Sequence, residues 1–203
     1  GRYIKAVVPE LARNLQVSKG ETNINTNIVG TTSDYPEVRG FKVAAGRMFT
    51  AGDDQARRRY AVLGGAIPGM LDANPVGMVG QNIQIRGIQF EIIGVLSEKG
   101  SQGSGWQNPD EQIFIPLQTA RYRVHGSDRL RSITVQASDA SDMNLTMIEI
   151  ERVLRREHKI RPGMDNDFQI RGQTDILATY EDTARTFTRL LAGIAIVSLI
   201  VGG

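Results

Sequence analysis

Side chains that could support metal or acid–base chemistry are few in this sequence and lie far apart. The two histidines, His125 and His158, are separated by 33 positions, and no carboxylate stands near them at the spacing of metal ligands. The chain has no cysteine, which excludes a thiolate metal site and a disulfide framework. His158 ends a predicted helix, where an imidazole can meet the last carbonyl groups. We therefore expect no metal site.

Motifs for nucleophilic or phosphate chemistry are also missing. The segment 100–105, GSQGSG, matches neither GxSxG nor GxGxxG, and the sequence contains no Walker A or HExxH motif. Carboxylate pairs such as Asp53–Asp54 and Asp165/Asp167 stand where turns and caps favour aspartate. We expect no catalytic residue and no bound cofactor, so the chain is not predicted to be an enzyme.

Two features could instead contact a partner. Trp106, the only tryptophan, follows the glycine-rich segment; it is either an exposed contact anchor or a side chain folded back onto the domain. The run Arg57, Arg58 and Arg59 reads as a solvated charge run, because no aromatic residue is interleaved with it as in a nucleic-acid interface. A formal net charge of only +2 gives little general attraction to nucleic acid.

Elements that would position these residues follow from hydrophobic spacing. Alternation predicts hairpins over 14–32, turning at Lys19–Gly20, and over 81–98, turning at Gly87. Asp34 is expected to cap a helical turn over 34–38, and Pro116 to place a strand at a sheet edge or to end it. Further strands are expected at 60–64, 112–117, 132–137 and 167–171, and helices at 66–71, 119–124 and 141–158. This mixture predicts an α+β (mixed α/β) fold.

The last residues, 190–203, read LLAGIAIVSLIVGG and contain one polar side chain, Ser198. At about 1.5 Å per residue the run covers about 21 Å, less than the roughly 30 Å of a bilayer core, and a buried core helix is the alternative. The run is apolar on all sides and ends without a cap, which favours the start of a truncated transmembrane helix. The predicted membrane residues are Leu190, Leu191, Ile194, Ile196, Val197, Leu199, Ile200 and Val201. The start at Gly1, without methionine or signal-peptide pattern, is typical of a piece of a longer chain.

Seven segments in order resemble the periplasmic region of MacB-type ABC-transporter permeases, of the FtsX-like permease superfamily. They are GTTSDYPEVRGFKVAAGRMFT (30–50), YAVLGG (60–65), VGQNIQIRGIQFEIIGVLSEKG (79–100), QIFIPLQTA (112–120), SITVQA (132–137), REH with DFQIR (156–171), and RTFTRLLAGIAIVSLIVGG (185–203). The resemblance implies a two-lobed extracytoplasmic domain: a porter-like α/β lobe (1–48 and 128–174), an inserted sabre-like lobe (49–127), and a stalk helix (175–203) leading into the membrane.

The resemblance also implies a function. Such a domain would couple cytoplasmic ATP hydrolysis to export of periplasmic antibiotics, peptides or toxins by mechanotransmission. ATP and Mg would bind a separate nucleotide-binding domain, and the implied partners are the bacterial inner membrane, a second permease copy, and a periplasmic adaptor with an outer-membrane channel. Lipoprotein release or regulation of cell-wall hydrolases on the same scaffold are the alternatives, and a secreted ligand-binding protein or enzyme is a third. The substrate, the use of an adaptor and a fused or separate ATPase stay open.

Overall fold

The computed structural model describes residues 3–71, 74–100, 108–172, 188, 190–192 and 194. These residues fall into two compact units, which are described one at a time. The first, here called the barrel unit, is Ile4–Gln136; the second, here called the helical unit, is Gly1–Tyr3 with Ala137–Gly203. The mixed α/β fold is confirmed.

A long hairpin opens the barrel unit. Strand β1 (Ile4–Lys19) pairs antiparallel with β2 (Thr22–Thr31), and the register from Leu11↔Gly30 to Lys19↔Thr22 runs to the end of the hairpin. Gly20 has a φ of 58°, the left-handed conformation that a tight turn requires and that glycine adopts without strain. The predicted hairpin and its turn at Lys19–Gly20 are therefore confirmed, although β1 begins well before residue 14.

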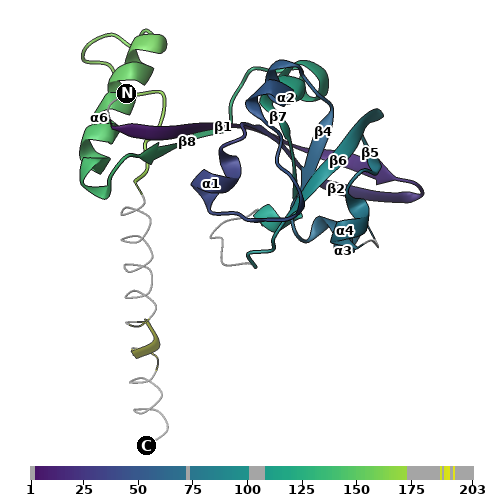
Figure 1. Ribbon diagram of the computed structural model, residues 1–203. Helices are drawn as coiled ribbons and strands as arrows, with labels where there is room; N and C mark the ends of the chain where they lie inside the picture. The colour runs from purple at the N-terminus through teal and green to yellow at the C-terminus, as the bar shows by residue number, and fades with distance from the viewer. Residues whose placement is uncertain are drawn as a thin grey trace, which may run out of the picture. The chain divides into compact units, whose positions relative to one another are not determined.

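The remaining strands are β3 (Val43–Gly46), β4 (Tyr60–Leu63), β5 (Asn82–Ile85), β6 (Ile88–Leu96), β7 (Gln112–Pro116) and β8 (Ser132–Ala137). Of these, β4 to β7 close the hairpin into a small barrel (Figure 1). The strand order is β2-β7-β4-β6-β5-β1, and β1 pairs back onto β2; β3 lies beside β6, and β8 beside β1. The pairs β2–β7 and β4–β6 are parallel, so segments distant in sequence become neighbours.

Successive side chains of a strand point to opposite faces of the sheet, so the apolar residues form two separate core clusters. Ile28, Leu63, Phe90, Ile92 and Ile113 belong to one cluster and are no more than 1% exposed. Their neighbours in sequence, including Val29, Val62, Ile93 and Phe114, belong to the other, which also contains Tyr35, Phe41 and Phe49. Because both faces of the central strands are buried, these strands read as continuous apolar runs.

Short helices cover the ends of the barrel, with α2 at one end and α3 and α4 at the other (Figure 1). They are α1 (Tyr35–Arg39), α2 (Ala51–Gln55), α3 (Ile67–Met70), α4 (Pro75–Met78), the 3-10 turn η1 (Pro109–Glu111) and α5 (Leu117–Thr119), which continues as a π-helix, η2 (Ala120–His125). The predicted helical segments at 34–38, 66–71 and 119–124 are confirmed. Asp34 precedes α1, but its side chain makes no capping hydrogen bond, so that detail is wrong.

In the helical unit, the 3-10 turn η3 (Ala140–Asp142) leads into α6 (Met143–Glu157). Asp139 accepts the backbone N–H of Ser141 at 2.8 Å and so begins the helical stretch. The strand predicted at 167–171 is wrong. Asp167 binds the His158 ring, and Phe168 packs edge-on against the same ring with centroids 5.8 Å apart. These local contacts hold the segment beside the end of α6 instead of in a sheet.

The strand order also bears on two expectations about organisation. Pro116 ends β7, which lies between β2 and β4, so it marks a strand end and not a sheet edge. The structure divides the chain between residues 136 and 137, and β1 and β2 share one sheet with β4 to β7. The lobes expected at 1–48 with 128–174 and at 49–127, and the stalk at 175–203, stay a prediction about functional parts of the chain.

Candidate partner-binding surface

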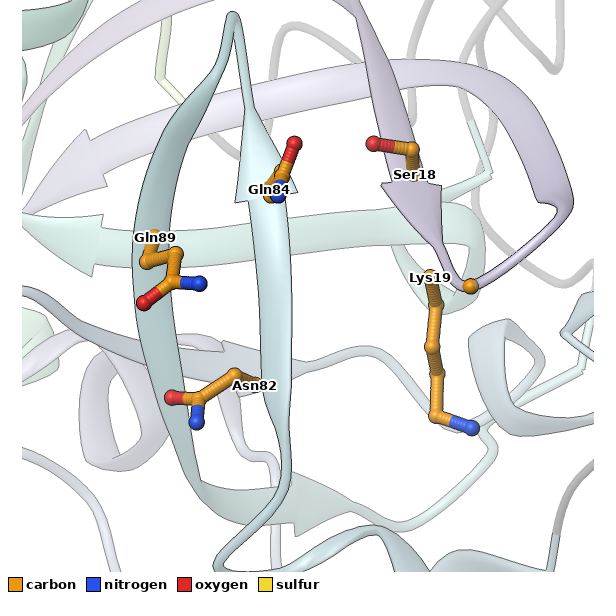
Figure 2. Close-up of a pocket in the computed structure, with 6 residues that line it drawn as sticks. Ser18, Lys19, Asn82, Gln84 and Gln89 are labelled. Atoms are coloured by element: carbon orange, nitrogen blue, oxygen red, sulfur yellow. The ribbon is translucent and has the colours of Figure 1, made fainter.

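A shallow polar hollow lies where the tip of the β1–β2 hairpin meets the β5–β6 hairpin (Figure 2). Its volume is about 280 Å³, and it is lined by Ser18, Lys19, Gly20, Asn82, Gln84 and Gln89. Ser18 pairs across strands with Gln84, and Gln84 with Gln89, so the sheet register brings the hydroxyl and the amides together. The lining contains no carboxylate, histidine or thiol, and Lys19 is its one ionisable side chain, so the hollow mainly offers hydrogen bonds to a partner.

A second hollow of about 430 Å³ contains Arg47, Tyr60 and Glu91 beside β6. The Arg47 guanidinium lies 5.5 Å from the Tyr60 ring centroid and 2.9 Å from Asp53 Oδ2. Asp53 forms a capping box with Thr50 at the start of α2, and the Thr50 backbone N–H, followed by Arg47, lowers the pKa of Asp53. Arg47 is thus engaged within the fold, and the carboxylate has the structural role that the sequence predicted.

The other paired carboxylates and the histidines also have structural surroundings. Asp54 accepts the Gln118 backbone N–H at 2.7 Å, and burial raises the pKa of its carboxyl. His125 is buried at the end of η2, and burial, aided by the charges of Arg13 and Arg86, lowers the pKa of its imidazole to about 4. The sequence predicted that the His158 imidazole would meet the last helix carbonyls. Instead, its Nδ1 lies 2.8 Å from Asp167 Oδ1.

Metal binding finds no support in the described ranges, where no group of three or more histidine, cysteine, aspartate or glutamate side chains could hold an ion. His125 belongs to the barrel unit and His158 to the helical unit. The prediction that the chain carries no catalytic or metal-binding residue stays a prediction, because only part of the chain is described.

Asp110 is a buried carboxylate that the sequence reasoning missed. It is 2% exposed, and its carboxylate accepts the backbone N–H groups of Lys99, at 3.0 Å, and Gly100, at 2.8 Å. Asn108 in turn accepts the Asp110 N–H at 3.1 Å. Asp110 therefore fixes both described ends of the loop that contains Trp106. Asn-Pro-Asp before a strand was the available signal, since asparagine and aspartate bind nearby backbone groups in this way.

Two glycines let this loop approach the barrel. A Cβ on Gly64 would lie 2.4 Å from the Asp110 carbonyl oxygen, and one on Gly65 would lie 2.6 Å from the Glu98 nitrogen. The YAVLGG segment therefore ends in glycine because backbone passes directly over it. Trp106 itself lies outside the described residues, so its role as a partner contact stays a prediction.

The predicted membrane segment is described only in part. Leu190, Leu191 and Ile194 are helical, with exposed fractions of 58%, 65% and 62%. Ile196, Val197, Leu199, Ile200 and Val201 lie outside the described residues. Within the described part of the chain, no helix reaches the length and apolarity that a membrane crossing requires. The start of a transmembrane helix is therefore still a prediction.

Known proteins resemble this chain over nearly its whole length. The family described as "MacB-like periplasmic core domain" matches residues 1–153. The macrolide export ATP-binding/permease protein MacB of Azoarcus sp. (strain BH72) is 34% identical over 200 residues, covering 98% of this chain and 29% of the relative. The pyoverdine export ATP-binding/permease protein PvdT of Pseudomonas aeruginosa is 31% identical over 202 residues, covering 98% of this chain and 29% of the relative. This chain thus spans less than a third of the length of these relatives.

Solved structures show the same fold. The periplasmic region of MacB from Actinobacillus actinomycetemcomitans superposes with a TM-score of 0.73 at 24% identity, covering 89% of this chain and 78% of that one. The extracellular domain of the ABC-type transporter YknZ from Gram-positive bacteria superposes with a TM-score of 0.64 at 22% identity, covering 78% of each chain.

Proposed function

Because this chain belongs to the MacB-like periplasmic core domain family, we propose that it is the extracytoplasmic domain of an ABC-transporter permease that drives export. The observation that carries this proposal is the match of 98% of the chain to export permeases at up to 35% identity. The relatives' names concern macrolide and pyoverdine export, so the proposed substrates are small molecules or peptides expelled from the periplasm.

The proposed mechanism is mechanotransmission, in which the chain moves but performs no chemistry. ATP and Mg would bind a nucleotide-binding domain in the cytoplasm, fused or separate, and this chain would need no cofactor of its own. Support comes from the residue types described above: the two hollows hold hydrogen-bonding and ion-paired groups without a catalytic arrangement. In this mechanism, transport energy would reach this domain as motion along the stalk helix that the sequence predicts at 175–203.

Placement in the membrane completes the proposal. Leu190, Leu191 and Ile194 present apolar side chains on a helix, as expected where a stalk enters lipid. The chain would then lie on the periplasmic side of a bacterial inner membrane, beside a second permease copy. An adaptor protein with an outer-membrane channel is the further proposed partner.

Distance measurements can test the mechanism. The chain would replace the matching region of the Azoarcus relative, with that relative's own cysteines removed; this chain contributes none. Spin labels at Val76→Cys in the barrel unit and Met164→Cys in the helical unit stand at positions 73% and 63% exposed. Pulsed electron paramagnetic resonance should then give different label distances in the ATP-bound and nucleotide-free permease.

A matched label pair within one unit serves as the control. Val76→Cys with Arg129→Cys lies wholly in the barrel unit and should give the same distance in both nucleotide states. If the pair at 76 and 164 also keeps one distance while the permease hydrolyses ATP and exports substrate, mechanotransmission through this chain is contradicted.

A further inference from the structure

The fold brings two arginine-bearing segments together on the barrel unit. Residues 57–59 follow α2, and Arg121 and Arg123 belong to η2. Thr119 donates its hydroxyl hydrogen to the Arg58 carbonyl at 2.8 Å, and Gln118 donates its backbone N–H to Asp54 Oδ1 at 2.7 Å. These hydrogen bonds fix the two segments side by side although they are about 60 residues apart in sequence.

An exposed aromatic ring lies between them. Tyr122 is 52% exposed, and the Arg57 guanidinium carbon is 4.2 Å from its ring centroid while that of Arg121 is 5.2 Å away. Arg57 follows α2 with a φ of 50°, and its N–H donates to the Asp54 carbonyl at 2.9 Å. The sequence showed no aromatic residue within the arginine run, and the fold supplies one from another segment.

Positive charge at this surface is only partly neutralised. Arg121 forms an ion pair with Asp128, and this pairing lowers the pKa of the Asp128 carboxyl. Within the described ranges, Arg57, Arg58, Arg59 and Arg123 form no ion pair. Even after Asp54, Asp128 and Glu91 are counted, the last because its backbone N–H donates to the Arg59 carbonyl at 2.9 Å, these five arginines leave two positive charges in excess.

We propose that this arginine–tyrosine patch (Arg57, Arg58, Arg59, Arg121, Tyr122 and Arg123) binds an acidic segment of a protein partner. Guanidinium groups pair with carboxylates through two parallel hydrogen bonds, which a lysine cannot do. Arginine and tyrosine are also the residues enriched at the energetic centres of protein interfaces. The proposal goes beyond the transport role above and does not depend on it.

A lipid surface fits this patch less well than a protein does. Proteins that lie on membranes insert apolar side chains below the headgroups. Here the apolar neighbours of Tyr122 are turned inward, since Ala120 and Val124 are 0% and 1% exposed. The patch therefore presents charge and one ring on an ordered backbone, which suits the carboxylates of a folded or extended peptide.

Binding of a fluorescent ten-residue glutamate peptide to the full chain, followed by anisotropy, tests the proposal. The variant Arg57→Gln/Arg58→Gln/Arg59→Gln should bind about threefold to a hundredfold more weakly, because three exposed charge contacts with the peptide are lost. Tyr122→Ala should weaken binding and Tyr122→Phe should not, because the ring and not the hydroxyl lies against the guanidiniums. Equal binding by Tyr122→Ala and the unchanged protein would overturn the proposal.

A matched control variant distinguishes binding at the patch from a general attraction between the positively charged protein and the negatively charged peptide. Arg152→Gln/Arg156→Gln/Arg161→Gln removes the same charge from three exposed positions of the helical unit and should bind the peptide within about twofold of the unchanged protein. Equal losses in the two triple variants would overturn the proposal, as would preferential binding to vesicles containing anionic phosphatidylglycerol that the 57–59 variant abolishes. Circular dichroism melting of every variant shows that the fold is retained.

Discussion

The barrel unit and the helical unit are stabilised in different ways. All the buried apolar side chains of the described residues lie between Val8 and Val124, within the barrel unit. In the described part of the helical unit, the polar residue Thr146 on α6 is buried, and its hydroxyl donates a hydrogen bond to the Tyr3 carbonyl at 3.1 Å. Leu145, Ile148 and Val153 of the same helix are exposed.

The described segment that follows α6 is held mainly by hydrogen bonds from one side chain of that helix. Arg155 donates to Asn166 Oδ1 and to the carbonyls of Arg161 and Met164, which ties the segment after the helix to its last turn. Such exposed contacts contribute less than buried apolar area does. The described part of the helical unit thus buries less apolar side-chain area than the barrel unit does, so we expect local unfolding to cost less free energy there than in the barrel.

The largest expected effect is on the barrel core. Phe90 is 0% exposed in the core cluster that also contains Ile28 and Leu63, so Phe90→Ala should lower the free energy of unfolding by about 3–5 kcal/mol. Ile148→Ala on α6, where the side chain is 63% exposed, should change it by less than about 0.5 kcal/mol. Urea denaturation measures both, and similar losses would show that the two units do not differ as described.

The next largest loss of stability is expected at Gly64, where two backbone segments lie in close contact. Gly64→Ala would place a Cβ 2.4 Å from the Asp110 carbonyl oxygen, so we expect a loss of about 1–3 kcal/mol from overpacking. Gly69→Ala is the control, because no atom lies within 4 Å of the position that its new Cβ would take, and it should be neutral or stabilising. Thermal melting of the two variants distinguishes them; equal melting temperatures would contradict the close approach.

How far the sequence predicts this fold depends on whether the information is local. The β5–β6 hairpin could be predicted because Ile83, Ile85 and Phe90 alternate with polar residues around Gly87. The closure of the barrel could not, because it depends on parallel pairs such as β2–β7, which join residues about 85 positions apart. The contact of Arg57 with Tyr122 was missed for the same reason. Local patterns therefore predicted the elements, and their partners required the three-dimensional structure.

Within the barrel unit, Asp110 should stabilise mainly the loop between Gly100 and Asn108, whose described ends it holds. Asp110→Asn keeps the size of the side chain but removes the charge from the hydrogen bonds with Lys99 and Gly100, so we expect a loss of about 1–2 kcal/mol. Hydrogen exchange should accelerate at these two amides and stay unchanged in β4 and β6. Uniform acceleration through the barrel would show instead that Asp110 supports the whole core.

The last effect is the pH dependence of stability that His125 should cause. The pKa of His125 is lowered to about 4 by burial, so between about pH 4 and 6.5 the unfolded chain binds a proton that the folded barrel does not. Stability should therefore fall as pH drops through this window, by about 2–3 kcal/mol, because a pKa difference of one corresponds to about 1.4 kcal/mol. His125→Asn should remove this part of the pH dependence in urea titrations at pH 7 and pH 4.5. An identical pH dependence in both proteins would contradict the assignment.

Cysteine labelling in intact cells tests the central claim, that this is an extracytoplasmic domain joined to a membrane helix. With the chain in place of the matching region of the Azoarcus relative, Val76→Cys should react with a membrane-impermeant maleimide added outside the inner membrane, because the residue is 73% exposed. Ile194→Cys should be protected by lipid until detergent is added. If Val76→Cys reacts only after the inner membrane is opened, the domain faces the cytoplasm and the account is contradicted.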